Sequence, residues 1–324
     1  MAKLTLIQAI NLALKEEMAR DPTVLVMGED VGKDGGVFRA TEGLIEQFGA
    51  ERVIDTPIAE STIVGAGLGL AVAGFKPVCE IQFDGFAFPA LDQLYNHVSR
   101  MRTRTRSKYH VPLVVRFPYG GGIRALEHHS ESPETYYAHI PGLKVVVPSN
   151  PYDAKGLLIS AIRDPDPVIF LEPKRIYRAF REEVPEGEYA VPLGQANVVK
   201  EGGDCTLVAW GSMVRLARTV AEKMADQYEI EVIDLRTLSP LDETTLVKSV
   251  KKTGRCVILH EAPRTSGFGG EIIARLQYHA LLHLKAPILR VTAFDVPVPL
   301  ARLEGYYIPN EVRLTKAIEE VMTF

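Results

Sequence analysis

Apolar runs alternate with amphipathic segments along almost the whole chain, and this alternation most limits the fold. The runs are typical of buried strands, and the stretches between them have helical periodicity. Strands that are apolar on both faces occur in parallel sheets covered by helices on each side. The runs begin at Thr23, Arg52, Lys76, Leu113, Gly142, Asp166, Cys205, Ile230, Cys256 and Pro287. The sequence therefore predicts an α/β fold with doubly wound parallel sheets.

The alternation is interrupted once, between Pro173 and Gly203, where prolines, glycines and mixed charges replace the apolar period. Such a change in composition indicates an interdomain connection. The 324 residues, of which 46% are hydrophobic, are enough for two cores. We predict a larger domain over residues 1–186, a linker over 187–203 and a smaller α/β domain over 204–324.

Composition excludes several classes of protein. With Lys+Arg 37 and Asp+Glu 41, the net charge of -4 gives no electrostatic case for a nucleic acid or membrane partner. The three cysteines are far apart and lack metal-site spacing, which indicates a reducing compartment. The longest uncharged run, Ile63–Phe75, is too short for a membrane span and predicts a core helix. The N-terminal segment has no targeting pattern, so we expect a cytoplasmic protein.

One carboxylate, Glu60, stands just before this uncharged run. Ser61 or Thr62 next to it can cap the helix, and Glu60 is expected where this helix starts. The helix dipole lowers the pKa of an acid there, whereas desolvation raises it. The residues alone favour a solvated or capping acid over a catalytic one, because acids are common in first helical turns.

A second feature is the segment EHHSESPE, which follows a Gly-Gly-Gly loop after a predicted strand. Loops at strand ends are where α/β sheets place their chemistry. As neighbours in sequence, His128 and His129 are expected to point in different directions and not to make a metal pair. One of them is a candidate acid/base or hydrogen-bond donor, and a structural loop histidine is an equal alternative.

Two further clusters have simpler explanations. Gln82, Phe83, Phe86 and Phe88 lie together at a strand end and could form a slot for a flat ring, although aromatic clusters usually belong to the core. Basic residues alternate with others from Arg100 to Lys108. In an acidic chain this pattern favours a subunit interface or solvent face over nucleic-acid binding.

Common catalytic signatures are missing from the sequence. The glycines at Gly65–Gly69 do not complete GxGxxG, and the Gly-Gly-Gly segment is followed by no P-loop lysine. Neither HExxH nor GxSxG occurs. If the protein is an enzyme, its difficult chemistry is expected to be carried by an organic cofactor.

Several blocks in order identify a family. They are GEDVGKDGGVFRATEGL, DTPIAES, EIQF, HSESPE, PGLKVVVPS, PYDAKGLL, VIFLEPK and DLRTLSPLD. With these blocks the chain resembles beta subunits of the thiamine-diphosphate-dependent component of 2-oxo acid dehydrogenase complexes, acting on pyruvate or branched-chain 2-oxo acids. The resemblance implies a transketolase-like pyrimidine-binding domain followed by a transketolase C-terminal domain.

The resemblance also implies partners. Relatives hold the cofactor diphosphate through Mg²⁺ in a GDG motif followed by NN, and this sequence contains no such pair. The resemblance therefore implies that an alpha subunit holds Mg²⁺ and completes the site in an α2β2 heterotetramer. It implies oxidative decarboxylation with acyl transfer to the lipoyl group of a dihydrolipoyl acyltransferase, which docks on the C-terminal domain.

The family motifs assign roles residue by residue. Glu60 matches the glutamate that activates the cofactor, and His129 matches the histidine that moves protons and holds substrate or lipoyl. Ile58, Gln82 and Phe86 match positions around the aminopyrimidine ring, and Phe86 replaces a frequent tyrosine. For its role Glu60 must hold a proton near neutral pH, so desolvation is expected to prevail. His128 has no matching role.

The resemblance further implies a structural K⁺ near AIRDPDP, with Ala161, Ile162, Asp164 and Asp166 as candidate ligands. Two alternatives remain open. One is a subunit similar to transketolase or deoxyxylulose-phosphate synthase, and the other is a non-catalytic scaffold. The preferred 2-oxo acid also remains open, because pyruvate and branched-chain substrates differ by a few methyl groups.

Overall fold

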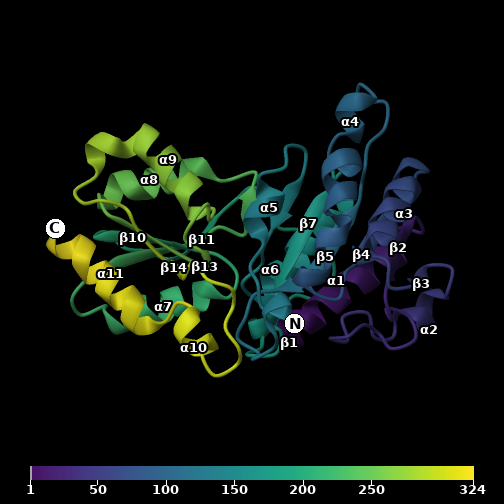
Figure 1. The fold of residues 1–324 in the computed structure, drawn as a ribbon, viewed down its shortest axis with the longest axis horizontal. Coiled ribbons are helices and arrows are strands. Elements are labelled where there is room, and N and C mark those ends of the chain that lie inside the picture. Colours follow the sequence, from purple (N-terminus) through teal and green to yellow (C-terminus); the bar gives the residue numbers. More distant parts are fainter. Residues whose placement is uncertain (1) are drawn as a thin grey trace.

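The computed structural model describes residues 2–324 and contains two α/β parts that lie side by side (Figure 1). The first part holds a seven-stranded sheet in the order β12-β6-β7-β5-β4-β2-β3, parallel except for β12. Its strands are β2 (Val24–Gly28), β3 (Val53–Asp55), β4 (Lys76–Glu80), β5 (Val114–Tyr119), β6 (Lys144–Val146) and β7 (Val168–Pro173), and β1 (Ala2–Leu4) pairs separately with β8 (Glu182–Val184). Its helices are α1 (Leu6–Arg20), α2 (Leu44–Phe48), α3 (Glu60–Val72), α4 (Met101–Arg104), α5 (Glu134–Ala138) and α6 (Pro151–Arg163).

Alternation along the strands separates two cores, because successive side chains point to opposite faces. Val78 on β4 joins the core formed with α1 and α6, whereas its neighbour Cys79 joins the core under α3. Local signals start the helices on these faces. Thr5 and Gln8 form a capping box before α1, and the Asn150 side chain accepts from the Asp153 amide at the start of α6.

The second part has a five-stranded sheet in the order β14-β13-β10-β11-β9, in which only β9 is antiparallel. Its strands are β9 (Asn197–Lys200), β10 (Cys205–Ala209), β11 (Ile230–Asp234), β13 (Cys256–Pro263) and β14 (Leu289–Ala293). Its helices are α7 (Met213–Lys223), α8 (Glu243–Thr253), α9 (Gly269–Ala280), α10 (Glu304–Tyr307) and α11 (Glu311–Thr323). The parallel strands and covering helices confirm the predicted α/β fold.

The two parts are joined by more than the connecting chain. β12 (Thr237–Ser239) leaves the second part and pairs with β6 at the edge of the first sheet. One hydrophobic cluster runs from Ile63 in α3 through Val147 and Trp210 to Leu276 in α9. This apolar contact fixes the second part against the first.

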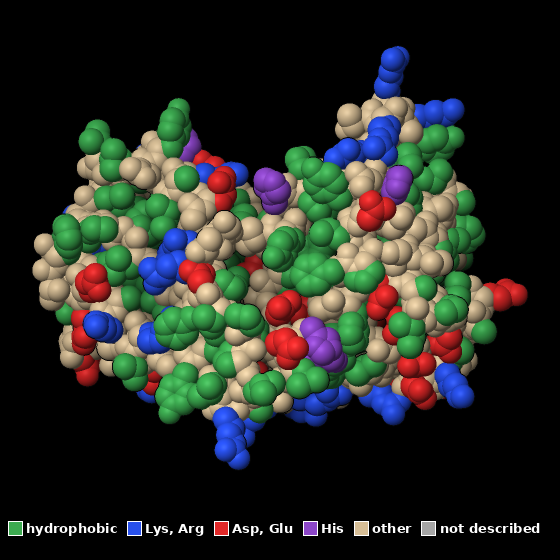
Figure 2. Space-filling view, viewed as in Figure 1, with side chains coloured by type: hydrophobic (Ala, Val, Ile, Leu, Met, Phe, Trp, Pro, Cys, Tyr) green, Lys and Arg blue, Asp and Glu red, His purple; other side chains and the backbone are tan. Residues whose placement is uncertain are grey.

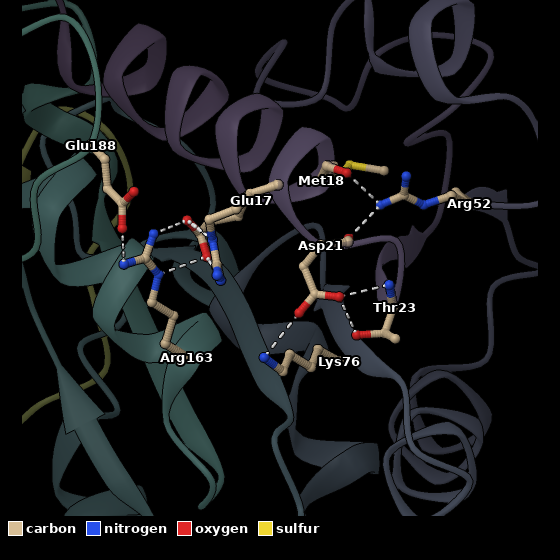
Figure 3. Close-up of polar contacts among 9 residues, drawn as sticks. Glu17, Met18, Asp21, Thr23, Arg52, Lys76, Arg163 and Glu188 are labelled. Carbon is tan, nitrogen blue, oxygen red and sulfur yellow. Dashed lines mark hydrogen bonds and ion pairs between the residues drawn. The ribbon is translucent and has the colours of Figure 1, made fainter.

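Ion pairs fasten helices and strands of the first part from outside the core (Figure 3). Glu17 on α1 pairs with Arg163 on α6 at 2.5 Å, and Asp21 pairs with Lys76 on β4 at 3.0 Å. The Arg52 guanidinium donates to the carbonyls of Met18 (2.8 Å) and Asp21 (3.0 Å). These contacts hold the C-terminal end of α1 beside the sheet.

Inside the sheet, Arg116 on β5 is buried between two carboxylates. Its guanidinium pairs with Glu172 on β7 at 2.5 Å and with Glu80 on β4, and the Tyr177 hydroxyl donates to Glu172 at 2.6 Å. A buried charge is tolerated only when it is paired and hydrogen-bonded. The network therefore locks the relative positions of three central strands.

The prediction of a core helix over Ile63–Phe75 is only partly right. The helix ends at Val72, and its buried residues are Ile63, Val64, Gly67 and Ala71. On the opposite face Thr62, Ala66 and Gly69 are exposed, whereas Leu68 and Leu70 are partly buried against the core. All three cysteines are buried and free. Among the described residues, no helix is both long and apolar enough to cross a membrane.

Candidate active site at the carboxyl edge of the first sheet

Four adjacent strands of the first sheet direct their carboxyl ends to one edge. Glu60 follows β3, Glu29 follows β2, Gln82 follows β4 and His129 follows β5. Neighbouring strands are about 4.8 Å apart, so the three steps from β3 to β5 make an edge about 14 Å wide. Ligands in open α/β sheets bind at this end of the strands. The fold thus brings the sequence-predicted residues to one edge.

Glu60 is the first residue of α3, and its side chain is half-buried. The expectation that Ser61 or Thr62 caps this helix is wrong. The N-cap is Ala59, which offers no side-chain acceptor, while the Ser61 hydroxyl donates to the Pro89 carbonyl. Ile58, just before the helix, is 83% exposed. This side of the edge is therefore open in the single chain.

Two acids that the sequence did not assign to the site, Glu29 and Asp30, follow β2 at this edge. The Glu29 side chain is buried, and its pKa is raised by desolvation and then by the charges of Glu60 and Asp30. The Gln82 amide nitrogen lies 3.4 Å from an Asp30 carboxylate oxygen. The sequence signal that could have identified these residues is an acid immediately after a buried parallel strand. The open wall is therefore acidic as well as exposed.

The opposite wall is aromatic. The His129 ring lies 4.2 Å from the Phe83 ring and 5.1 Å from the Phe86 ring, both edge-on, and 4.2 Å from the His128 ring. Phe88 instead contacts Tyr136, outside this cluster. Figure 2 shows histidine and acidic side chains together low on the front face, near the boundary between the two parts. Two of the three predicted phenylalanines thus line the histidine side.

A buried ion pair supports this wall. The Lys174 ammonium lies 3.2 Å from Asp84, both side chains are buried, and Lys174 also sits 5.9 Å from the Phe83 ring centroid. Desolvation outweighs the pairing and raises the pKa of Asp84 to about 7. Burial, His128 and Lys174 lower the pKa of His129. The His129 imidazole is therefore neutral at neutral pH, and its buried Nδ1 has no partner among the described residues.

The segment expected to bind K⁺ lies elsewhere, at the end of α6. The Asp164 carboxylate accepts from the Lys144 ammonium at 2.6 Å, and Asp166 pairs with Arg102 at 2.6 Å. Arg102 belongs to the basic stretch around α4, which projects from the first part (Figure 1). Within residues 2–324, no cluster of three or more His, Cys, Asp or Glu side chains is arranged to hold a metal ion.

Comparisons with known proteins agree with this architecture. Residues 2–179 match the transketolase pyrimidine binding domain, and residues 194–314 match the transketolase C-terminal domain. The pyruvate dehydrogenase E1 component subunit beta of Acholeplasma laidlawii is 53% identical over 99% of this chain and 98% of its own length. The subunit of the same name from Staphylococcus epidermidis is 50% identical over the whole of both chains. The chain is a member of the 2-oxo acid dehydrogenase E1 beta-subunit family.

A solved structure described as a split gene transketolase, inactive beta4 tetramer, has a TM-score of 0.82 with this E1 beta-subunit family member. It covers 99% of each chain at 22% sequence identity, which supports the fold alone. The predicted family, fold and enzyme class are confirmed. The protein is one subunit of a 2-oxo acid dehydrogenase and works as a component of a larger complex.

Proposed function

We propose that this E1 beta subunit acts on pyruvate and contributes one wall of a thiamine diphosphate site shared with an alpha subunit. The observation that carries the proposal is the meeting of Glu60, Gln82, Phe86 and His129 at one sheet edge. The names of the full-length relatives favour pyruvate over branched-chain substrates. We place the proposed α2β2 assembly in the cytoplasm. In this chain we propose domains over residues 1–186 and 204–324 joined by residues 187–203, within which β9 (Asn197–Lys200) pairs with the second sheet.

The residues at the edge fit the aminopyrimidine end of the cofactor. Phe86 offers an aromatic face, Ile58 offers an exposed apolar side chain, and Gln82 offers an amide for polar ring atoms. The edge does not suit the diphosphate. Glu29, Asp30 and Glu60 are acidic, and the nearby Lys174 is already paired with Asp84. The diphosphate and its Mg²⁺ are therefore assigned to the alpha subunit.

When bound, thiamine diphosphate supplies a nucleophilic carbon and an electron sink for the loss of CO₂ from a 2-oxo acid. Glu60 holds a proton on its carboxyl group and shares it with a ring nitrogen. A partner that covers Ile58 and the start of α3 desolvates this carboxyl group, and desolvation favours the protonated form. The neutral imidazole of His129 accepts and returns a proton on the substrate side and orients the lipoyl group.

Two peripheral sites belong to the same proposal. A K⁺ ion near Ala161 and Ile162 is held by backbone oxygens, since Lys144 and Arg102 already neutralise Asp164 and Asp166. The acyltransferase docks on the C-terminal domain. There the end of α9 and the turn after it expose Tyr278 (85%) and Leu282 (95%), which supports a contact with another protein.

The test is reconstitution with an alpha subunit, thiamine diphosphate and Mg²⁺. We expect CO₂ release from pyruvate to exceed release from 3-methyl-2-oxobutanoate, although an apolar pocket separates such substrates by only about 1–3 kcal/mol. Calorimetry on the chain alone should detect no tight, Mg²⁺-dependent cofactor binding. Tight binding there would contradict the shared site, and failure of the mixture to release CO₂ from either acid would contradict the proposed function.

A further inference from the structure

The Gly120–Gly122 segment is the base of the loop that carries His129. The Gly120 amide donates to the Glu131 carbonyl at 2.7 Å, so the loop is closed where it leaves β5. At its far end the chain forms the short 3-10 turn η4 (Glu127–His129). The position of the imidazole therefore depends on how this closed loop is held.

Two buried carboxylates of the C-terminal domain accept from the loop backbone. The Gly121 amide donates to Glu261, which also accepts from the Ser212 hydroxyl at 2.8 Å. The Gly122 amide donates to Glu304 Oε1 at 2.8 Å, and the Arg124 amide donates to Oε2 at 3.1 Å. Hydrogen bonds to carboxylates are stronger than neutral ones, and burial strengthens them further.

This contact also explains the three glycines, which do not form a phosphate loop. Gly120 and Gly122 have φ of 80° and 94°, a region that disfavours other residues. A Cβ at Gly121 would lie 2.9 Å from Ile308 Cδ1, and one at Gly122 would lie 2.5 Å from Arg175 Cδ. Side chains at these positions would keep the loop amides from reaching the carboxylates, so glycine is required.

The histidine end of the loop is held by the first domain. A Cβ on Gly85 would lie 2.0 Å from the His128 carbonyl oxygen, so η4 rests directly on this glycine. Beyond it, the His129 ring contacts Phe83 and Phe86. The loop thus spans from the C-terminal domain to the aromatic wall and is fixed at both ends.

We propose that Glu261 and Glu304 are positioning residues, by which the C-terminal domain keeps the His129 imidazole in place for the reaction. The proposal rests on the proposed function of His129. Neither glutamate touches the reacting groups, and each acts through the loop backbone. Removing Glu304 leaves two loop amides without an acceptor, so the loop samples other positions and His129 spends less time against Phe83.

The first experiment measures amide hydrogen exchange over residues 120–131 of the full chain. In Glu304→Ala we expect the Gly122 and Arg124 amides to exchange roughly 10- to 100-fold faster, as expected for the loss of charge-assisted hydrogen bonds. In Glu304→Gln, which keeps one side-chain oxygen acceptor, the change should be smaller. Glu311→Ala is the matched control, because Glu311 borders the same cleft but pairs with Lys223. Unchanged exchange in Glu304→Ala would overturn the proposal.

The second experiment uses the reconstituted complex and compares acyl transfer to a lipoyl domain with 2-oxo acid oxidation by an artificial acceptor. We expect Glu304→Ala to lower kcat for acyl transfer roughly 10-fold or more, with KM for the 2-oxo acid nearly unchanged. The loss should vanish in a His129→Ala background, whereas a general structural defect would add to it. An additive loss overturns the positioning role. An inactive wild-type complex contradicts the proposed function instead, and the exchange experiment still tests the contacts between the two glutamates and the loop backbone.

Discussion

The two walls of the candidate site differ in how much of their support lies within this chain. The His129 wall is packed against Phe83 and Phe86, lies above the buried Asp84–Lys174 pair and is tied to the C-terminal domain through Glu304. The Glu60 wall lies at the start of a helix whose Thr62, Ala66 and Gly69 are exposed, and beside the exposed Ile58. One wall is complete and the other is open.

This difference indicates which wall of the site needs a partner subunit. A neutral imidazole can be produced by burial within one chain, and the structure achieves this for His129. The Glu60 side chain, by contrast, is only half-buried in the single chain. The apolar surface around Glu60 is therefore the part of the site that assembly should change most.

The largest effect is expected at the open wall. In the reconstituted complex, Glu60→Gln should lower 2-oxo acid decarboxylation by about 10²- to 10⁴-fold, because Gln cannot hold or release a proton. The free energy of unfolding of the isolated chain should change by less than about 0.5 kcal/mol. Glu51→Gln, an exposed acid before β3, is the control. Full activity in Glu60→Gln would show that the subunit is a scaffold at this site.

At the closed wall, substitutions of the neighbours His128 and His129 should have different effects on acyl transfer. We expect His129→Ala to slow acyl transfer by about 10²-fold, the loss typical of a removed acid/base group. His128→Ala should change it by less than about 3-fold, because the His128 side chain is partly exposed and faces Glu127 at 3.8 Å. Kinetics with a lipoyl domain measures both. Equal losses would mean that the histidine pair, and not His129, is the functional unit.

Glycine-to-alanine substitutions should change the free energy of unfolding in opposite directions at the two walls. Gly85→Ala places a methyl group against the His128 carbonyl and should destabilise the chain by about 1–3 kcal/mol. A Cβ at Gly69 on α3 meets nothing within 4 Å, so Gly69→Ala should stabilise the isolated chain by about 0.5–1 kcal/mol. Urea denaturation measures both changes. If the exposed face of α3 is covered on assembly, Gly69→Ala should also weaken binding of the alpha subunit.

The last expected effect, on stability alone, is a pH dependence behind the closed wall. Burial raises the pKa of Glu134 to about 8, and the Trp210 indole donates to this carboxyl group at 3.3 Å. Since the acid binds a proton when folded and loses it when unfolded, stability should fall as pH rises from about 4.5 to about 8. The slope is at most about 1.4 kcal/mol per pH unit. Glu134→Gln keeps an acceptor for the indole and should remove this slope.

Denaturation of wild type and Glu134→Gln at pH 5 and pH 8 is sufficient for this test. The variant should gain stability over wild type as the pH rises, and parallel curves would mean that Glu134 is ionised in the folded chain. The same comparison for Glu51→Gln should give no slope, since this side chain is exposed in the folded chain.

Much of the fold followed from local pattern. The strands expected from Lys76 and Cys205 form as β4 and β10. The short strands β9 and β12 were missed, because each is set by a neighbour distant in sequence. The π-helical turn over Gln93–Val98 could not be predicted, since its backbone geometry has no clear signal in residue type.

The sequence by itself determined the family, the order of strands and helices, and the residue types at the strand ends, because apolar period and motif spacing are local properties. Tertiary structure decided which of those residues meet. Glu304 lies 182 residues from Gly122 and Glu261 lies 140 residues from Gly121, yet both accept from the histidine loop. Contacts at such separations depend on how two domains pack, and only the folded chain specifies that packing.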